Sequence, residues 1–291
     1  MGYGMRFSGS RRSDRICYRK EKRKESMIID IHTHAFDAKV AERAVSGIEE
    51  ESGITPYTRG TPEQLIRRMD EWGVDMAAVL PIATKPSQQK TINDWAAALA
   101  EREPRLIMFG TVHPDAEDCI EEVGRIKALG LKGIKLHPDY QNFMADDPKL
   151  DSLYTAIAKS GLPMLIHSGW DCHSPELVHC PPVRALRMIE RHRDLKVILA
   201  HLGGNDRWDQ VLELIACHDG EVYLDTAFTA KCPDKLMAEI IRTHGSDRVM
   251  LGSDCPWEST QKIIEKIMRL PLSTREREEI LGANAQRLFG L

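Results

Sequence analysis

Short apolar runs alternate with amphipathic stretches from residue 27 to the end of the chain, and this alternation constrains the fold more than any other feature. Each run has four to eight residues and is bounded by Gly, Pro, Asp or Ser. Runs that are apolar almost throughout are typical of parallel strands buried on both faces. The eight predicted strands cover residues 27–34, 76–83, 105–112, 131–138, 163–169, 196–203, 221–227 and 249–254.

The segments between these runs have helical spacing. The clearest helix begins with Thr61 as its N-cap and Pro62 at its first position, with Gln64 closing a capping box, and it ends before Gly73. Seven more helices, each of which follows a strand, are predicted at residues 91–103, 115–129, 150–160, 182–193, 206–217, 233–244 and 259–269, and a closing helix follows at 273–289. Residues 35–60 have no clear period, so we expect a long loop there that forms a lid or a substrate wall.

Eight strands that alternate with eight helices in about 265 residues match the count of a (β/α)8, or TIM, barrel. An open doubly wound sheet is the alternative. No GxGxxG or GxxxxGK[ST] motif follows any strand, which argues against a nucleotide-binding protein of that second type. We therefore predict an α/β protein with a single TIM-barrel domain over residues 27–291.

Residues 1–26 differ from the rest of the chain. They carry nine Lys and Arg against three acids, a net charge of about +6, and they have few apolar residues. Such a segment cannot bury enough surface to become ordered, so we predict a disordered basic extension, or a chain whose natural start is Met27. An arm that binds an anionic surface or nucleic acid is the alternative.

Composition excludes several classes of protein. The whole chain is 42% hydrophobic and 29% charged with a net charge of −4, which does not call for nucleic acid as a partner. The longest apolar runs are far too short to cross a bilayer. The seven cysteines are scattered without a CxxC motif, as in a protein of a reducing compartment. We expect a cytoplasmic protein that acts on a small molecule, without a membrane or nucleic-acid partner.

Two histidines lie at the end of the first predicted strand. His32 and His34 are two residues apart, so their side chains project from the same face of the strand. Active sites of barrels form at the carboxyl ends of the strands. Two neutral imidazoles side by side are suited to bind a divalent metal, although this pair alone is weak support for one.

Three later strands end in the same way. Each apolar run delivers one potential metal ligand just before a Gly, Ser or Pro turn: His167, His201 and Asp254. Burying these imidazoles and the carboxylate without a cation would cost several kcal/mol. The residues therefore predict a divalent metal that is shared between strands.

The motifs that carry these residues resemble those of the amidohydrolase superfamily, and more narrowly its amidohydrolase-2 group. The motifs are Ile-Asp-Ile-His-Thr-His at 29–34, Leu-Ile-His-Ser-Gly at 165–169, Ala-His-Leu-Gly-Gly at 200–204 and Gly-Ser-Asp-Cys-Pro-Trp at 252–257. The resemblance implies that one divalent ion is held by His32, His34, His167 and Asp254. Nitrogen-rich ligation favours Zn²⁺, with Mn²⁺ or Fe²⁺ also acceptable. The resemblance further implies that His201 has a catalytic role or binds a second metal. It is also compatible with a homodimer.

The fourth predicted strand leaves two alternatives open. Lys135 and His137 share one face of this strand. In some members of the superfamily a carboxylated lysine at this place bridges two metals. We favour the other alternative, in which Lys135 pairs with a buried acid and His137 supports the site or contacts the substrate. Asp30 is expected to support the site from below, and Asp225 to line its mouth.

The group includes hydrolases of amides, esters and lactones, and also nonoxidative decarboxylases. We expect a metal-dependent hydrolase, in which Asp254 accepts a proton from a metal-activated water and His201 stabilises the developing oxyanion. The alternative is a decarboxylase of a small unsaturated or aromatic acid, which needs the same ligands; Arg59 and Arg184 are candidates to bind its carboxylate. A non-catalytic binding protein is the less favoured third class. Residues 171–180 resemble a second zinc cluster, but their irregular spacing favours a lid.

Overall fold

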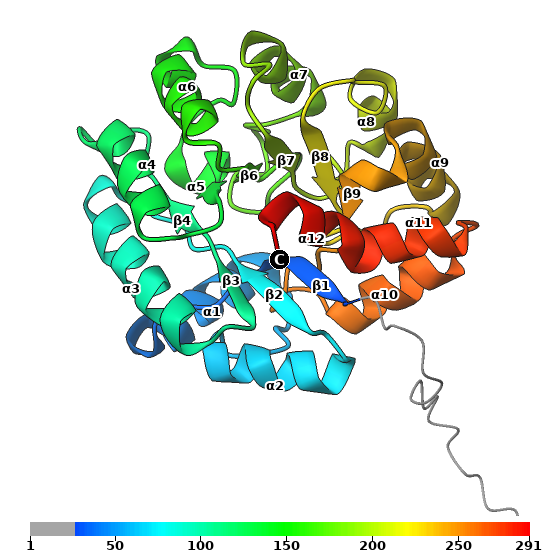
Figure 1. Cartoon of the computed structure of the whole chain (residues 1–291), viewed down its shortest axis with the longest axis horizontal. Coiled ribbons are helices and arrows are strands. Elements are labelled where there is room, and N and C mark those ends of the chain that lie inside the picture. Colours follow the sequence, from blue (N-terminus) through cyan, green and yellow to red (C-terminus); the bar gives the residue numbers. More distant parts are fainter. Residues whose placement is uncertain (1–26) are drawn as a thin grey trace, which may run out of the picture.

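The computed structural model describes residues 27–291, and the predicted basic extension at 1–26 lies outside the described residues. Parallel strands form a central barrel, and helices surround it (Figure 1). The strands are β1 (Ile29–Thr33), β2 (Met76–Val79), β3 (Leu106–Met108), β4 (Gly110–Thr111), β5 (Ile134–Leu136), β6 (Met164–Ile166), β7 (Val197–Leu199), β8 (Val222–Asp225) and β9 (Val249–Met250). The prediction of a TIM barrel is confirmed.

The third predicted strand is divided where it changes partner. β3 pairs with β2, whereas β4 pairs with β5. Between them, the backbone N–H of Phe109 donates to Val79 O at 3.1 Å, and that of Gly110 donates to Gly133 O at 2.9 Å. The two segments therefore occupy the place of one barrel strand.

Backbone hydrogen bonds between β1 and the segment from β9 onward close the barrel. Ile31 N–H donates to Leu251 O at 2.8 Å, and Asp254 N–H donates to His32 O at 2.7 Å. Against β2, the register of β1 shifts between Asp30 and Thr33. A β-bulge of this kind re-aims the side chains that follow it. Ile31 consequently belongs to the inner core, while the next residue, His32, also lies among polar groups of other strands.

Apart from a short additional helix after β5, the helices follow the predicted pattern with three differences. Their bounds are α1 (Ala38–Ser52), α2 (Pro62–Trp72), α3 (Gln89–Arg102), α4 (Cys119–Ala128), α5 (Pro138–Gln141), α6 (Asp151–Ser160), α7 (Pro182–Arg191), α8 (Trp208–Leu214), α9 (Asp234–His244), α10 (Thr260–Arg269), α11 (Thr274–Glu278) and α12 (Asn284–Phe289). A π-helical turn separates α11 from α12 within the single predicted closing helix. The side chain of Thr61 caps α2, but Gln64 binds the backbone N–H of Arg59 and does not close a capping box.

The third difference is α1, which lies where a long loop was expected. The Asp37 side chain accepts from Lys39 N–H at the start of this helix, and Gly53 ends it in the left-handed region with φ 68°. Only Ala41 and Val45 are buried. Because so few apolar residues are needed to hold α1 against the barrel, the sequence shows no clear helical stripe.

The core has two layers. Side chains from the inner faces of the strands form one cluster inside the barrel, and a larger cluster fills the space between the barrel and the helices. α12 crosses the end of the barrel in Figure 1, where the ring of Phe289 packs against Phe109 at 5.7 Å between centroids. This apolar plug leaves the opposite end, with the carboxyl ends of the strands, for polar side chains.

Within residues 27–291, none of the helices combines the length and apolar character that crossing a membrane requires.

Buried His244, at the end of α9, predicts a pH dependence of stability. Its ring donates from Nε2 to Val222 O at 3.0 Å, and burial lowers its pKa from 6.5 to about 4. The unfolded chain therefore binds this proton more readily, and the stabilisation present above pH 6.5 is lost as the pH falls towards 4. We expect this residue alone to reduce the free energy of unfolding by about 2 kcal/mol between pH 7 and pH 5. Urea denaturation at both pH values should show a smaller loss in His244→Gln; equal losses would contradict the prediction.

Candidate active site

Three of the predicted metal ligands converge at the mouth of the barrel. Asp254 Oδ1 lies 3.1 Å from His34 Nε2 and 3.4 Å from His32 Nε2. One ligand atom from each residue lies within 4.8 Å of the other two. We call His32, His34 and Asp254 the first cluster.

The hydrogen bonds of the two histidines determine which ring nitrogens are free. His32 Nδ1 is 2.8 Å from Asp225 Oδ2, and His34 Nδ1 is 2.9 Å from Leu80 O. Because these oxygens accept, both Nδ1 atoms carry the proton, and both Nε2 lone pairs face the carboxylate of Asp254. The Nε2 atom of His32 also accepts from Lys135 Nζ at 3.4 Å. Three acceptors thus face one another, an arrangement that a cation stabilises.

Electrostatics favour the same protonation states. Burial lowers the pKa of His32 well below its usual value, and the charge of Lys135 lowers it further. Burial alone would raise the pKa of Asp254, but the neighbouring basic groups His34, His201 and Lys135 lower it on balance. A neutral imidazole and a carboxylate are the forms that bind a divalent metal, so the donor set fits such an ion.

The backbone holds Asp254 in an unusual conformation. Its φ of 75° lies in the left-handed region, which non-glycine residues seldom adopt. His201, at the end of β7, is also left-handed with φ 59°. Strain of this kind is concentrated at functional sites, where surrounding hydrogen bonds maintain it. For Asp254 the bond from its N–H to His32 O does so.

His201 and His167 form a directed pair beside the first cluster. His201 Nδ1 donates to Ala227 O at 3.2 Å, so its Nε2 must accept the bond from His167 Nδ1 at 2.9 Å. Burial lowers the pKa of His201 to about 3 and that of His167 to about 4, so both rings are neutral at pH 7. His167 Nε2 is therefore a bare lone pair, and it has no hydrogen-bond partner.

The fourth residue that the resemblance assigns to this ion, His167, lies in a neighbouring group of potential ligands. His167 does not share a set of mutually close ligand atoms with His32, His34 and Asp254 among residues 27–291. It belongs instead to a second group with His137 and Asp171. His137 follows β5 and stacks on His167 with centroids 4.2 Å apart.

Asp171 is a potential ligand that the strand-end pattern does not indicate. It lies in the loop after β6 and not at a strand end, within residues 171–180, the irregular spacing of which predicts a lid. The loop is placed by Gly169, whose φ is 94° and where a Cβ would lie 2.0 Å from Asn205 N. The Asp-Cys-His run itself was the available signal, but its spacing could not show that Asp171 turns inward.

Lys135 differs from the expected buried ion pair. Its Nζ lies 3.4 Å from His32 Nε2, and within residues 27–291 no carboxylate oxygen lies within 4.0 Å of it. Burial lowers its pKa to about 8, against the opposing charge of Asp254. The residue thus places a buried ammonium group beside the first cluster.

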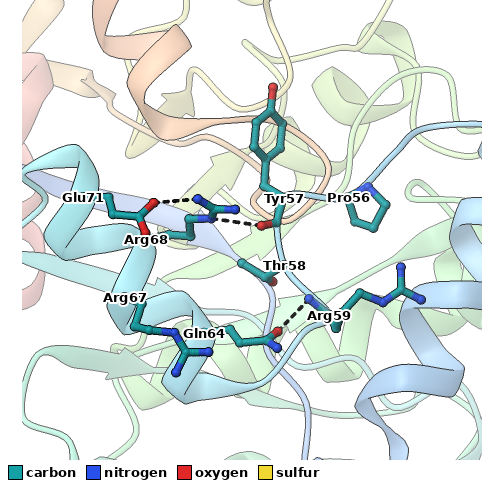
Figure 2. A pocket seen from close by; sticks show the side chains of 8 residues that line it. All are labelled: Pro56, Tyr57, Thr58, Arg59, Gln64, Arg67, Arg68 and Glu71. Carbon is teal, nitrogen blue, oxygen red and sulfur yellow. Dashed lines mark hydrogen bonds and ion pairs between the residues drawn. The ribbon is translucent and has the colours of Figure 1, made fainter.

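Neither arginine proposed for substrate binding has a free guanidinium. Arg59 pairs with Glu42 and Glu49, and Arg184 pairs with Asp146. Arg59 lines a surface pocket of about 310 Å³ between α2 and the loop before it. Figure 2 shows Arg68 of this pocket held by Glu71 and the backbone carbonyl of Tyr57. None of the clustered histidines lines this pocket, so it is separate from the candidate site.

Comparison with known families identifies the class of this protein. The family model described as Amidohydrolase matches residues 29–291. Because the match spans nearly the whole chain, the protein belongs to the amidohydrolase family. It is a TIM-barrel member of the amidohydrolase superfamily.

Solved structures with the same fold include two named decarboxylases. The 5-carboxyvanillate decarboxylase from Sphingomonas paucimobilis is 17% identical with a TM-score of 0.67, and the match covers 92% of this chain and 100% of that one. The dihydroxybenzoic acid decarboxylase from Polaromonas sp. JS666, with bound manganese and the inhibitor 2-nitroresorcinol, is 16% identical with a TM-score of 0.69 over 92% and 98%. An uncharacterized TIM-barrel protein from Bordetella bronchiseptica is 18% identical with a TM-score of 0.71 over 91% and 98%.

The expectation that the chain is a hydrolase is corrected by this comparison. Both of these solved structures with a named activity are decarboxylases. The alternative interpretation from the sequence, nonoxidative decarboxylation, is therefore the better supported one. The physical reason for the error is that a buried His/Asp metal cluster serves either reaction, so the ligand motifs do not distinguish them.

Proposed function

We propose that this protein is a metal-dependent nonoxidative decarboxylase of a small aromatic or unsaturated acid. The observation that carries the proposal is the first cluster, in which two lone pairs and a carboxylate face one another in a fold shared with named decarboxylases. The substrate would be a small molecule. A homodimer stays a prediction.

The first cluster would hold the resident ion through His32 Nε2, His34 Nε2 and the Asp254 carboxylate. When bound, a divalent ion supplies Lewis-acid polarisation of substrate oxygens. Nitrogen-rich ligation suits Zn²⁺, and manganese is present in the Polaromonas enzyme, so both metals are to be tested.

Other residues orient and charge the site. The Asp225 carboxylate accepts from His32 Nδ1–H, which keeps the ring turned with Nε2 toward Asp254. The Lys135 ammonium, which lacks an acid partner within reach in the described chain, would pair with the substrate carboxylate. Burial of this lysine keeps competing water away from that ion pair.

The reaction needs one proton for each CO₂ released. The carbon–carbon bond to the carboxylate breaks, its electron pair stays on the substrate carbon, and a proton is added to that carbon. We assign the transfer of this proton to Asp254. Its carboxylate is 14% exposed, takes up a proton from solvent and passes it to the substrate carbon. His201 donates its Nδ1 proton to Ala227 O. Its ring would therefore stay neutral and line the site without transferring a proton.

Product analysis tests this function. The protein is loaded with Zn²⁺ or Mn²⁺ and incubated in D₂O with dihydroxybenzoates, 5-carboxyvanillate and related unsaturated acids. We expect CO₂ release and a product with a single deuterium at the carbon that lost the carboxylate. His34→Gln should reduce the release together with the metal content, whereas the exposed His173→Gln, which contacts Glu51, should not change it. Cleavage of esters or lactones by the same preparation without any CO₂ release would overturn the proposal.

A further inference from the structure

The surface pocket beside α2 is rich in basic side chains. It has a volume of about 310 Å³ and lies between α2 and the loop that precedes this helix (Figure 2). Arg59, Arg67 and Arg68 line it, whereas Glu71 is its single acidic residue. A cavity of this size can hold a small molecule. We call it the arginine pocket.

Two of the three arginines are already bonded. Arg59 pairs with two glutamates of α1, at 2.6 Å and 2.7 Å. Arg68 donates from Nη1 to Glu71 at 2.5 Å and from Nε to Tyr57 O at 3.0 Å. These bonds engage the only carboxylate of the pocket, and they leave Arg68 Nη2 without an acceptor among residues 27–291.

Arg67 is the cation of the pocket that lacks a partner. In the part of the chain that the structure describes, no carboxylate oxygen lies within 4.0 Å of its guanidinium, and it donates no hydrogen bond. Arg67 lies three residues after Gln64, so the two side chains are neighbours on one face of α2, as Figure 2 shows. A guanidinium has five N–H donors and a permanent charge. The pocket therefore offers a positive charge that the protein does not neutralise locally.

Two neutral side chains are oriented as donors toward the same space. The backbone N–H of Arg59 donates to Gln64 Oε1 at 2.6 Å, so the amide oxygen must face the loop and the NH₂ group is left over. The backbone N–H of Gly60 donates to Thr58 Oγ1 at 3.1 Å, which leaves the hydroxyl proton of Thr58 to be donated. Thr58 is 8% exposed. Neither Gln64 Nε2 nor the Thr58 hydroxyl has an acceptor within the described residues.

The wall of the pocket is fixed before any ligand arrives. Tyr57 N–H donates to Pro256 O at 2.8 Å, and Phe36 N–H donates to Gly60 O at 2.8 Å. These bonds hold the loop before α2 against the segments that follow β9 and β1. A site that is already formed loses little conformational entropy when a ligand binds.

We propose that the arginine pocket binds the phosphate group of a small molecule. Four donor groups face the pocket, and a phosphate offers three or more acceptor oxygens with a charge of about −2 at pH 7. Guanidinium groups match phosphate oxygens in geometry and charge. A carboxylate has only two oxygens, so it would satisfy fewer of these donors. The volume exceeds that of the phosphate alone, which favours a phosphate monoester over the free ion. No residue of the first cluster lines the pocket, so the proposal is independent of decarboxylation.

Calorimetric titration identifies the ligand class. The full-length, metal-loaded protein is titrated with glycerol 3-phosphate, with inorganic phosphate, and with glycerate as the matched carboxylate. We expect one equivalent of glycerol 3-phosphate to bind, and glycerate to bind about tenfold more weakly or less tightly still. Inorganic phosphate that binds as tightly as the ester would support the site and identify the free ion as its ligand. Glycerate that binds as tightly as the ester would overturn the assignment to phosphate.

Two variants of the pocket are compared with two controls. Arg67→Gln removes the unpaired charge. Gln64→Glu keeps the oxygen that Arg59 N–H needs but replaces the donor NH₂ by a negatively charged oxygen. Each should weaken the binding of glycerol 3-phosphate by about tenfold or more. Arg275→Gln, which alters an arginine that is 86% exposed on α11, and His34→Gln in the first cluster should leave the affinity unchanged. Binding that is lost in His34→Gln but kept in Arg67→Gln would place the anion on the resident metal and overturn the pocket.

Thermal unfolding gives a second readout, which does not depend on turnover. A ligand that binds the native state raises the unfolding midpoint. Glycerol 3-phosphate should therefore raise the midpoint of the wild type and of Arg275→Gln, but not that of Gln64→Glu. Circular dichroism shows whether each variant is folded, and Gln64→Glu answers the question if Arg67→Gln is not. The absence of saturable phosphate binding, or binding that survives both pocket variants, would overturn the site. Intact phosphate binding without any CO₂ release would overturn the proposed function alone.

Discussion

Asp254→Asn is expected to lower the rate of CO₂ release by about 10³-fold or more and to lose the ion of the first cluster. The amide cannot carry the proton for the substrate carbon. It also replaces the only carboxylate of the first cluster. The Oδ1 atom of this carboxylate lies 3.1 Å from His34 Nε2 and 3.4 Å from His32 Nε2. Asn has nearly the same size and also tolerates left-handed φ, so the backbone at φ 75° should be retained.

Steady-state rates and metal content of the purified variant measure this effect. His34→Gln removes a ligand but leaves Asp254 in place. It should therefore lower the metal content as strongly as Asp254→Asn does, but it should lower the rate of the metal-saturated enzyme less than Asp254→Asn. Asp70→Asn is a matched control, because Asp70 pairs with Arg105 on the surface and is 62% exposed. Normal metal content and normal rate in Asp254→Asn would contradict both roles that we assign to this residue.

The residues at strand ends could be predicted from the sequence because their positions follow from the period of a strand. His32 and His34 lie two residues apart, and both reach Asp254 across the barrel. Closure of the barrel brings residues 32 and 254 together through Asp254 N–H and His32 O. A pattern of buried strands already implies that their carboxyl ends meet.

The loops could not be predicted in the same way. Asp171 reaches the site only because Gly169 adopts a left-handed turn against Asn205, and such a contact leaves no periodic signal. The bulge between Asp30 and Thr33 also leaves no signal in the sequence. Apolar and polar residues alternate along β1 as they do in a regular strand. The activity was mistaken because the ligands of hydrolases and decarboxylases are the same, whereas the groups that select the substrate lie on loops.

Asp30→Ala is expected to destabilise the protein by roughly 3–5 kcal/mol, the largest effect on stability that we predict. The Asp30 carboxylate, 1% exposed, accepts four hydrogen bonds. Oδ1 accepts from the backbone N–H groups of His32 at 3.1 Å and Ser253 at 3.0 Å. Oδ2 accepts from the hydroxyls of Ser253 at 2.6 Å and Thr260 at 2.7 Å. Alanine leaves two buried N–H groups and two hydroxyls without their acceptor.

This carboxylate also connects β1 to the segment after β9 and to the start of α10, so its loss should loosen both sides of the first cluster. Thermal unfolding should show a midpoint lowered by roughly 5–8 °C. Metal affinity should fall as well, because Asp30 accepts a hydrogen bond from the backbone of His32 and two from Ser253, which precedes Asp254. Asp30→Asn is the matched control. Its amide oxygen can still accept from the two N–H groups, while the hydroxyls of Ser253 and Thr260 rotate to accept from its NH₂. An alanine variant that unfolds at the same temperature as the asparagine variant would show that these four bonds do not hold the barrel closed.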